Sequence, residues 1–164
     1  MKKTYSQFLD VQSPEWRDRA CGIVALGSMM AHWDVADAPS LDDLITIGVQ
    51  NGAYLPGVGW KHQGIVELAT RYGLAGKCFD WFAEDPWVAF LKFIELLGDG
   101  PVIASIHRDF DVKNGGHLVI VEDANGVVRY HDSAARERTD IERTASVGTF
   151  LVGWKRRAIA IRRS

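Results

Sequence analysis

Two short apolar runs joined by Asn125-Gly126 restrict the fold of this chain more than any other feature. Asn-Gly between apolar runs is a strong short-range signal for a β-hairpin, because both residues tolerate the positive φ angles of a two-residue turn. A turn at these two residues pairs Glu122 with Arg129 and Val119 with Asp132. Because a slip of one residue would exchange the faces of a strand, this register predicts which side chains lie together.

The predicted register places a histidine and an aspartate on the same face of the hairpin. His117 precedes Val119 by two residues, so it is a diagonal neighbour of Asp132, with Cβ atoms about 6–8 Å apart. The remaining residues of this face are apolar: Val119, Val121, Val128 and Tyr130. We therefore expect this face to pack on the helices, including the one that begins with Cys21. The opposite face, which carries a second histidine, His131, is expected to be solvated.

A cysteine stands at the start of an apolar segment with helical spacing. Apolar residues recur every three or four positions from Ile23 to Trp33, which predicts a helix that begins at Cys21. Unpaired N–H groups in the first turn of a helix stabilise a thiolate and lower the pKa of the thiol. A base such as His117, oriented by Asp132, can take the thiol proton and activate the cysteine as a nucleophile.

Each of these residues also has an ordinary structural interpretation. A cysteine at a helix start can be a small core residue, and a buried histidine beside an aspartate can serve only the core. The conjunction of the three residue types favours a nucleophilic site. The second cysteine, Cys78, lies within a predicted strand and is interpreted as structural. A metal site formed by His117, His131 and Asp132 is rejected, because the hairpin register directs His131 to the other face.

The order of the predicted elements indicates one α+β domain over residues 1–164. Helices are expected over residues 41–50, 61–72, 86–97 and 147–154, and strands over residues 5–12, 74–81, 101–107, 118–122, 127–131 and 158–161. Ser40, as part of a capping box with Asp43, and Asp85 are expected to cap the first and third of these helices. The segment 54–60 is expected to be a loop, and the polar segment 135–144 shows no clear pattern. We expect the helical half, about residues 13–98, to pack on one face of an antiparallel sheet in the second half, about residues 99–164.

Composition and charge argue against several classes of protein. The chain has 164 residues and a formal net charge of −2, so no nucleic-acid partner is expected. No apolar stretch is long enough to span a membrane, and the first residues lack the apolar region of an export signal. These observations predict a cytoplasmic protein with reduced thiols and no membrane partner. No pattern indicates a cofactor, a metal or an oligomeric state.

The motifs that surround these residues resemble the papain-like cysteine peptidases related to bacteriocin-processing, double-glycine leader peptidases. The resemblance covers nearly the whole chain, and its motifs follow one another in the order of the family. It rests on Gln12, Trp16, Cys21-Gly22, the segment 116–121 (Gly-His-Leu-Val-Ile-Val) and the segment 130–133 (Tyr-His-Asp-Ser). This chain departs from the family pattern at three positions, Ala20, Ile23 and Ser133, where the family usually has an aspartate, a proline and a proline.

The resemblance implies a papain-like fold and a role for each residue of the site. Cys21 would be the nucleophile, His117 the general base and acid, and Asp132 the carboxylate that orients the imidazole. Gln12 would donate its side-chain amide, together with the backbone N–H of Cys21, to the oxyanion of the tetrahedral intermediate.

Four further residues are predicted to contact the substrate: Trp16, Gly22, Trp60 and Gly116. Gly116 leaves the backbone bare beside His117, so a substrate chain can approach the imidazole closely. Gly22 follows the nucleophile in the family motif. Trp16 and Trp60 can line a groove for the substrate, or they can close the edge of the core.

The sequence thus predicts a cysteine peptidase that cleaves a peptide or amide bond in a peptide or protein through a thioester acyl-enzyme. Two alternatives stay open. An acyl- or amide-group transferase would use the same three residues with an acceptor other than water, and a non-catalytic peptide-binding module would keep only the fold.

Overall fold

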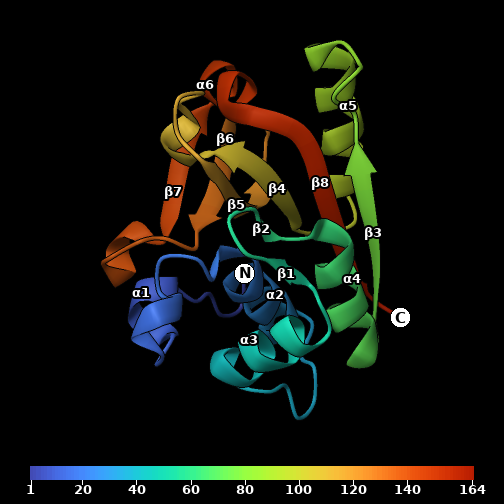
Figure 1. Ribbon diagram of the computed structural model, residues 1–164. Helices are drawn as coiled ribbons and strands as arrows, with labels where there is room; N and C mark the ends of the chain where they lie inside the picture. Colours follow the sequence, from blue (N-terminus) through green and yellow to red (C-terminus); the bar gives the residue numbers. More distant parts are fainter.

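A six-stranded antiparallel sheet lies at the centre of the computed structural model, which describes residues 1–164 (Figure 1). In spatial order its strands are β3 (Leu74–Asp80), β8 (Trp154–Arg163), β4 (Val102–His107), β5 (Gly116–Asp123), β6 (Val127–Asp132) and β7 (Glu142–Ser146). A separate two-stranded ribbon consists of β1 (Tyr54–Leu55) and β2 (Gly59–Trp60). The segment 54–60, expected to be a loop, is therefore a small hairpin that projects from the helical part of the chain.

Six α-helices surround the sheet: α1 (Gln7–Asp10), α2 (Cys21–His32), α3 (Leu41–Gln50), α4 (His62–Arg71), α5 (Pro86–Leu97) and α6 (Val147–Gly153). Three short 3-10 helices cover Pro14–Trp16, Arg108–Phe110 and Arg138–Asp140. The predicted N-caps of α3 and α5 are observed, because the side chain of Ser40 accepts the N–H of Asp43 and the side chain of Asp85 accepts those of Trp87 and Val88.

The first predicted element is wrong. Residues 5–12 were expected to form a strand, but residues 7–10 form α1, because the hydroxyl of Ser6 caps the first turn by accepting the N–H of Phe8. The polar segment 135–144, which showed no clear pattern, contains the start of β7. This strand lies at the edge of the sheet and is mostly exposed, so it has no apolar alternation.

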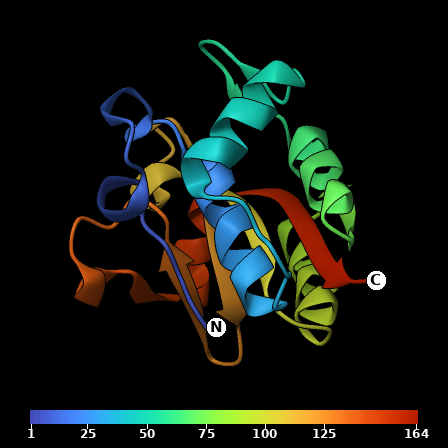
Figure 2. The ribbon, with the colours of Figure 1, turned by 90° about the horizontal axis from the view of Figure 1, so that it is seen from below.

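Helices cover both faces of the sheet. Leu118 and Ile120 of β5 belong to a core cluster with α2, α3 and α4, whereas Val119 and Val121 belong to a second cluster with α5 and α6. Figure 1 shows α5 above and apart from α2 and α3, and in Figure 2 α2 and α3 lie in front of the strands. The expected α+β class is confirmed, and α2, α3 and α4 share one face as predicted, whereas α5, which was expected on the same face, packs on the opposite one.

The expected contents of the two faces are wrong. The face with Val119 and Val121 packs on α5 and α6, and the helix that begins with Cys21 packs on Leu118 and Ile120. The side chain of His131, expected in solvent, is buried and its Nε2 lies 2.9 Å from Oε2 of Glu122. The continuous apolar run from residue 118 to 121 is in fact typical of a strand that is buried on both sides.

The hairpin of β5 and β6 keeps the predicted register where it matters for the site. Val119 faces Asp132, as the sequence predicts. Nearer the turn the register shifts by one residue between Val121 and Asp123, so Asp123 faces Arg129 and the predicted pair of Glu122 with Arg129 is wrong. A β-bulge near the turn thus accounts for the one-residue shift, and the predicted pairing is kept at the end of the hairpin that is far from the turn.

The second core cluster is rich in packed aromatic rings, and Phe93 of α5 is one of its fully buried members. Its ring centroid lies 5.0 Å from that of Trp154 and 5.6 Å from that of Phe150. We expect Phe93→Ala to lower the free energy of unfolding by about 3–5 kcal/mol in urea denaturation, because it leaves a cavity between these rings. Leu91→Ala on the exposed side of the same helix should cost less than about 1 kcal/mol. Equal losses in the two variants would contradict this account of the core.

Candidate active site

Cys21 is the first residue of α2, as the spacing of the apolar residues predicts. No side chain caps this end of the helix, so its first N–H groups are not satisfied by a capping oxygen. The next residue, Gly22, packs closely on Trp60: a Cβ at Gly22 would lie 2.8 Å from the Cβ of Trp60. The helix start is therefore held against the wall that Trp60 forms.

Cys21 meets His117 at the end of the sheet, where β5 and β6 separate. The pairing of the two strands stops at Val119 and Asp132, and the hydroxyl of Ser133 donates to the carbonyl of Leu118 at 2.9 Å. Because the pairing with β6 does not reach Leu118, its backbone N–H can donate to the sulfur of Cys21. Cys21 thus approaches His117 from the strand ends, although His117 shares its strand face with residues that pack on α5.

The imidazole of His117 lies between the thiol and a carboxylate. Its Nε2 is 2.8 Å from Oδ1 of Asp132, and both side chains are buried. Its Nδ1 is buried and has no hydrogen-bond partner, so it is the nitrogen that is available to the thiol of Cys21, whose pKa the imidazole lowers. The order sulfur, imidazole and carboxylate is the order that a nucleophile, a base and its orienting group require.

The Asp132 carboxylate is held by two further groups. The N–H of Ala134 donates to Oδ1 at 2.9 Å, and the guanidinium of Arg143 donates to Oδ2 at 3.2 Å. Arg143 lies on β7, in the segment that showed no clear pattern in the sequence. Burial opposes ionisation of Asp132, but the hydrogen bonds from His117, Ala134 and Arg143 hold the pKa of this carboxyl below its usual value.

The pKa values of the thiol and the imidazole are displaced in opposite directions. Burial by itself would raise the pKa of the Cys21 thiol, but the hydrogen bond and charge of His117, the N–H of Leu118 and the charge of Arg108 lower it. Burial would lower the pKa of His117, but its contacts with Asp132 and Cys21 raise it to about 9. Both displacements favour transfer of the thiol proton to the imidazole.

A cavity of about 730 Å³ opens beside the pair. Its lining includes Cys21 and His117 together with Trp60 and Gly116, two of the four residues that the sequence assigned to substrate binding. Cys78 also lines this cavity, but burial and the charge of Glu67 raise the pKa of its thiol. The two cysteines therefore share a cavity and differ in their ionisation.

The other two predicted contact residues support the cavity from behind. Trp16 packs on Tyr54 and Trp60, with ring centroids 5.0 and 6.0 Å away, and it is not part of the lining. Gly22 is buried against Trp60, so it serves close packing of the helix. The indole N–H of Trp60 donates to the carbonyl of Arg19 at 2.8 Å, which fixes the ring near the start of α2.

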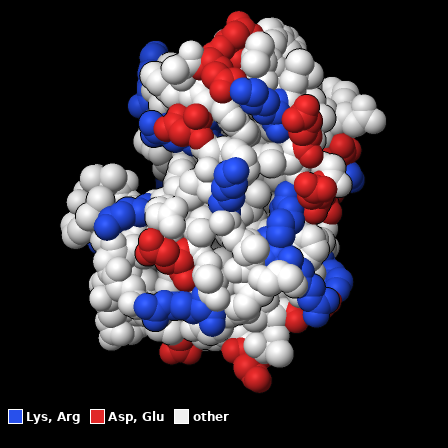
Figure 3. All heavy atoms as spheres, turned by 90° about the vertical axis from the view of Figure 1, so that its right-hand side faces the viewer, with Lys and Arg blue, Asp and Glu red and all other residues white.

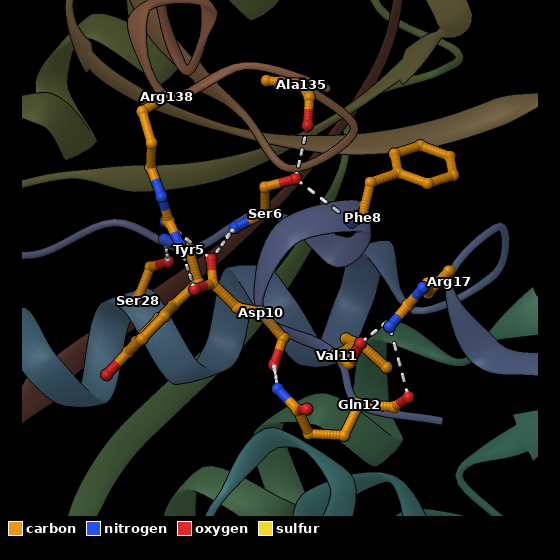
Figure 4. Close-up of polar contacts among 10 residues, drawn as sticks. All are labelled: Tyr5, Ser6, Phe8, Asp10, Val11, Gln12, Arg17, Ser28, Ala135 and Arg138. Carbon is orange, nitrogen blue, oxygen red and sulfur yellow. Dashed lines mark hydrogen bonds and ion pairs between the residues drawn. The ribbon is translucent and has the colours of Figure 1, made fainter. Parts of the chain in front are cut away.

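Gln12 does not reach the cavity. It is exposed, and its amide nitrogen lies 3.5 Å from the carbonyl oxygen of Asp10, whereas its own carbonyl accepts from Arg17 (Figure 4). A different glutamine, Gln7 in α1, is completely buried, and neither its amide nitrogen nor its amide oxygen has a partner. The sequence offers one signal for it, the potential cap Ser6 directly before it, which marks the start of a helix.

Neither a metal cluster nor a membrane span is observed. No group of three or more His, Cys, Asp or Glu side chains could hold a metal ion, and His131 is engaged with Glu122. No helix has both the length and the apolar character needed to cross a bilayer.

Comparison with solved structures identifies the class of fold. The peptidase domain of Streptococcus ComA, a bi-functional ABC transporter, matches 90% of this chain and 93% of its own length, with a TM-score of 0.65 and 18% identity. A double glycine motif protease from an AMS/PCAT transporter, in complex with its leader peptide, matches 88% of this chain and 84% of its own length, with a TM-score of 0.60 and 16% identity.

A third solved structure has the same architecture. The N-terminal peptidase C39 like domain of a toxin secretion ATP-binding protein from Vibrio parahaemolyticus matches 88% of this chain and 97% of its own length, with a TM-score of 0.59 and 15% identity. No family model and no curated protein matches the chain by sequence. The chain therefore has the papain-like fold of peptidase C39 domains, as its motifs suggested.

Arg143 makes a testable contribution to the ionisation of the site. In Arg143→Met the Asp132 carboxyl loses a hydrogen-bonded cation, so the pKa of this carboxyl should rise. On acidification the carboxylate is then protonated at a higher pH, and it no longer stabilises the His117 imidazolium below that pH. We expect the pH at which the rate of Cys21 alkylation falls on acidification to move up by about half to one pH unit. Arg138→Met, which removes a cation from Asp10 instead, should leave this pH unchanged. The same unchanged pH in Arg143→Met would show that Arg143 does not act on the carboxylate.

Proposed function

We propose that this chain is a cysteine peptidase that hydrolyses a peptide or amide bond. The observation that carries the proposal is that Cys21 and His117 line one cavity and that the imidazole lies 2.8 Å from the carboxylate of Asp132. The fold shared with peptidase C39 domains supports it, and so does the leader peptide bound to one of those proteins.

The reaction follows from the protonation states of the pair. The Cys21 thiolate attacks the carbonyl carbon, and the His117 imidazolium gives its proton to the leaving amine, which departs as the thioester forms. Water then attacks the thioester while the imidazole takes one of its protons, and collapse of the second intermediate releases the acid and restores the pair. Asp132 keeps the ring in position and stabilises its charge throughout.

The backbone N–H of Cys21 supplies one donor to the oxyanion, and we assign the second to Gln7 in place of Gln12. The N–H of Gln7 donates to the carbonyl of Ser133 at 2.8 Å, and the hydroxyl of Ser133 donates to Leu118, whose N–H contacts the sulfur. A buried amide without a partner is costly, so a group retained in this state is typical of a site whose partner arrives with the substrate.

The assignment of Gln7 predicts opposite changes in stability and rate. Gln7→Leu removes an unsatisfied buried amide, so we expect it to raise the free energy of unfolding by about 1 kcal/mol. Loss of an oxyanion donor should at the same time lower kcat by about 100-fold for a peptide identified from a library. Gln12→Leu should change neither quantity. A Gln7→Leu variant that keeps its kcat would leave the amide with no part in the reaction.

The activation of Cys21 can be measured without a substrate. The lowered thiol pKa and the His117 pKa of about 9 predict that the rate of Cys21 labelling by iodoacetamide falls less between pH 8 and pH 6.5 than that of an ordinary thiol, which slows roughly 20-fold over this range. His117→Ala should restore the ordinary slope. Cys78, read by mass spectrometry in the same samples, provides the internal control because its thiol pKa is raised.

Slow labelling of Cys21 that is the same with and without His117 would instead favour a peptide-binding module without turnover. When labelling is fast, incubation of the protein with a peptide library in the presence and absence of added amines separates hydrolysis from transfer. Products that carry the added amine would identify a transferase.

A further inference from the structure

The charged residues that line the catalytic cavity are mainly basic: Arg19, Lys61, Arg108, Lys155 and Arg157 face only Asp18 and Asp80. Asp80 accepts from Arg157 at 2.8 Å, and Asp18 lies 3.4 Å from Arg19. Three cations, Lys61, Arg108 and Lys155, form no ion pair. The cavity of a chain with a net charge of −2 therefore holds an excess of unpaired positive charge.

Two of the unpaired cations flank the catalytic histidine. Ile106 of β4 pairs with His117 on one side and with Trp154, the neighbour of Lys155, on the other. The ammonium of Lys155 lies over Gly116: a Cβ on this glycine would be 3.0 Å from Nζ. Arg108 directly follows β4, whose last residue, His107, pairs with Gly116, and the backbone N–H of Arg108 donates to the carbonyl of Gly115 at 2.9 Å.

The positive charge reaches the reacting groups. Beyond the contacts with His117 and Leu118, the charge of Arg108 also lowers the pKa of the Cys21 thiol. At the other end of the cavity, burial lowers the pKa of His62, and the charges of Arg157 and Lys155 lower it further. Two titratable groups on different helices are thus both affected by cations of this cavity.

The face of the molecule that carries β3 and α5 has no comparable excess of one charge. On the face that carries β3 and α5, basic and acidic residues are interspersed among uncharged ones, without a large area of one sign (Figure 3). Lys155 is half-buried and has no carboxylate partner, a state that costs part of its hydration without a compensating ion pair. An anion that enters with the substrate would supply the missing partner.

We propose that the substrate carries a carboxylate close to the scissile bond, and that Lys155 and Arg108 bind this carboxylate. Gly116 leaves room for the ammonium and for the substrate backbone beside it, and the guanidinium of Arg108 can bind a carboxylate with two parallel hydrogen bonds. The inference rests on the proposed function and specifies its substrate: an acidic peptide, in which the carboxylate belongs to a side chain or to the free C-terminus.

The test compares two alkylating reagents that differ only in a carboxylate. Iodoacetate and iodoacetamide both react by displacement of iodide by the thiolate, so the ratio of their rate constants at Cys21 measures the preference of the site for an anion. We expect Lys155→Met and Arg108→Met each to lower this ratio about five-fold at low ionic strength, and less at high salt. Lys113→Met, which removes an exposed cation outside the cavity, should leave the ratio unchanged.

The outcomes separate the inference from the proposed function. A reactive Cys21 whose ratio is the same in all three variants would overturn the inference and leave the peptidase proposal intact. If Cys21 reacts with neither reagent faster than Cys78 does, the peptidase proposal fails. The inference is then decided by titration with N-acetylglutamate and N-acetylglutamine, monitored by NMR. Tighter binding of the acid that is lost in Lys155→Met supports the inference, and equal binding overturns it.

Peptide substrates then identify the source of the carboxylate. Peptides that differ by Glu or Gln at one position test a side-chain carboxylate, and peptides with a free or amidated C-terminus test the terminal one. In the charge-reversed Lys155→Glu variant, the cleavage rate should be higher for peptides with Lys than for peptides with Glu at the substrate position where the unmodified protein prefers Glu. Equal rates for every such pair in the unmodified protein would overturn the inference.

Discussion

The hydrogen bond between Nε2 of His117 and Oδ1 of Asp132 is the interaction on which the rest of the site depends. It exists because Val119 faces Asp132 across the hairpin, which makes the histidine and the aspartate diagonal neighbours. The bulge between Val121 and Asp123 absorbs the length of the turn without disturbing this pairing. A hairpin that carried the shift to its far end would move the aspartate to the other face and leave the imidazole without its carboxylate.

The same strand ends bring the nucleophile within reach. Strands β5 and β6 separate beyond Asp132, so Leu118 has a free N–H and the start of α2 can enter the gap. The site therefore lies where regular pairing stops, between two layers of helices that cover opposite faces of the sheet. Ser133, which replaces the proline of the family pattern, contributes a hydroxyl that closes this end by its bond to Leu118.

Much of this arrangement could be predicted from the sequence, because it depends on local signals. The helix start at Cys21, the capping box at Ser40 and the Asn-Gly turn each fixed an element, and the turn also fixed the partner of His117. What could not be predicted has identifiable causes. Arg143 lies on an exposed edge strand without apolar alternation, the bulge has no sequence signal, and Gln7 lies on a helix of four residues. The run from residue 118 to 121 is apolar at every position, so its pattern does not indicate which face of the strand packs on α2.

The contact between Gly22 and Trp60 couples the position of the Cys21 sulfur to the position of a residue that lines the cavity. One side of the cavity and the first turn of α2 are in van der Waals contact without any intervening side chain, so a bulkier or repositioned ring would displace the thiolate along with the wall. Lys155, which also lines the cavity, contacts Gly116 and takes no part in the contact between Gly22 and Trp60. A change of this side chain would alter the charge of the cavity without displacing the start of α2.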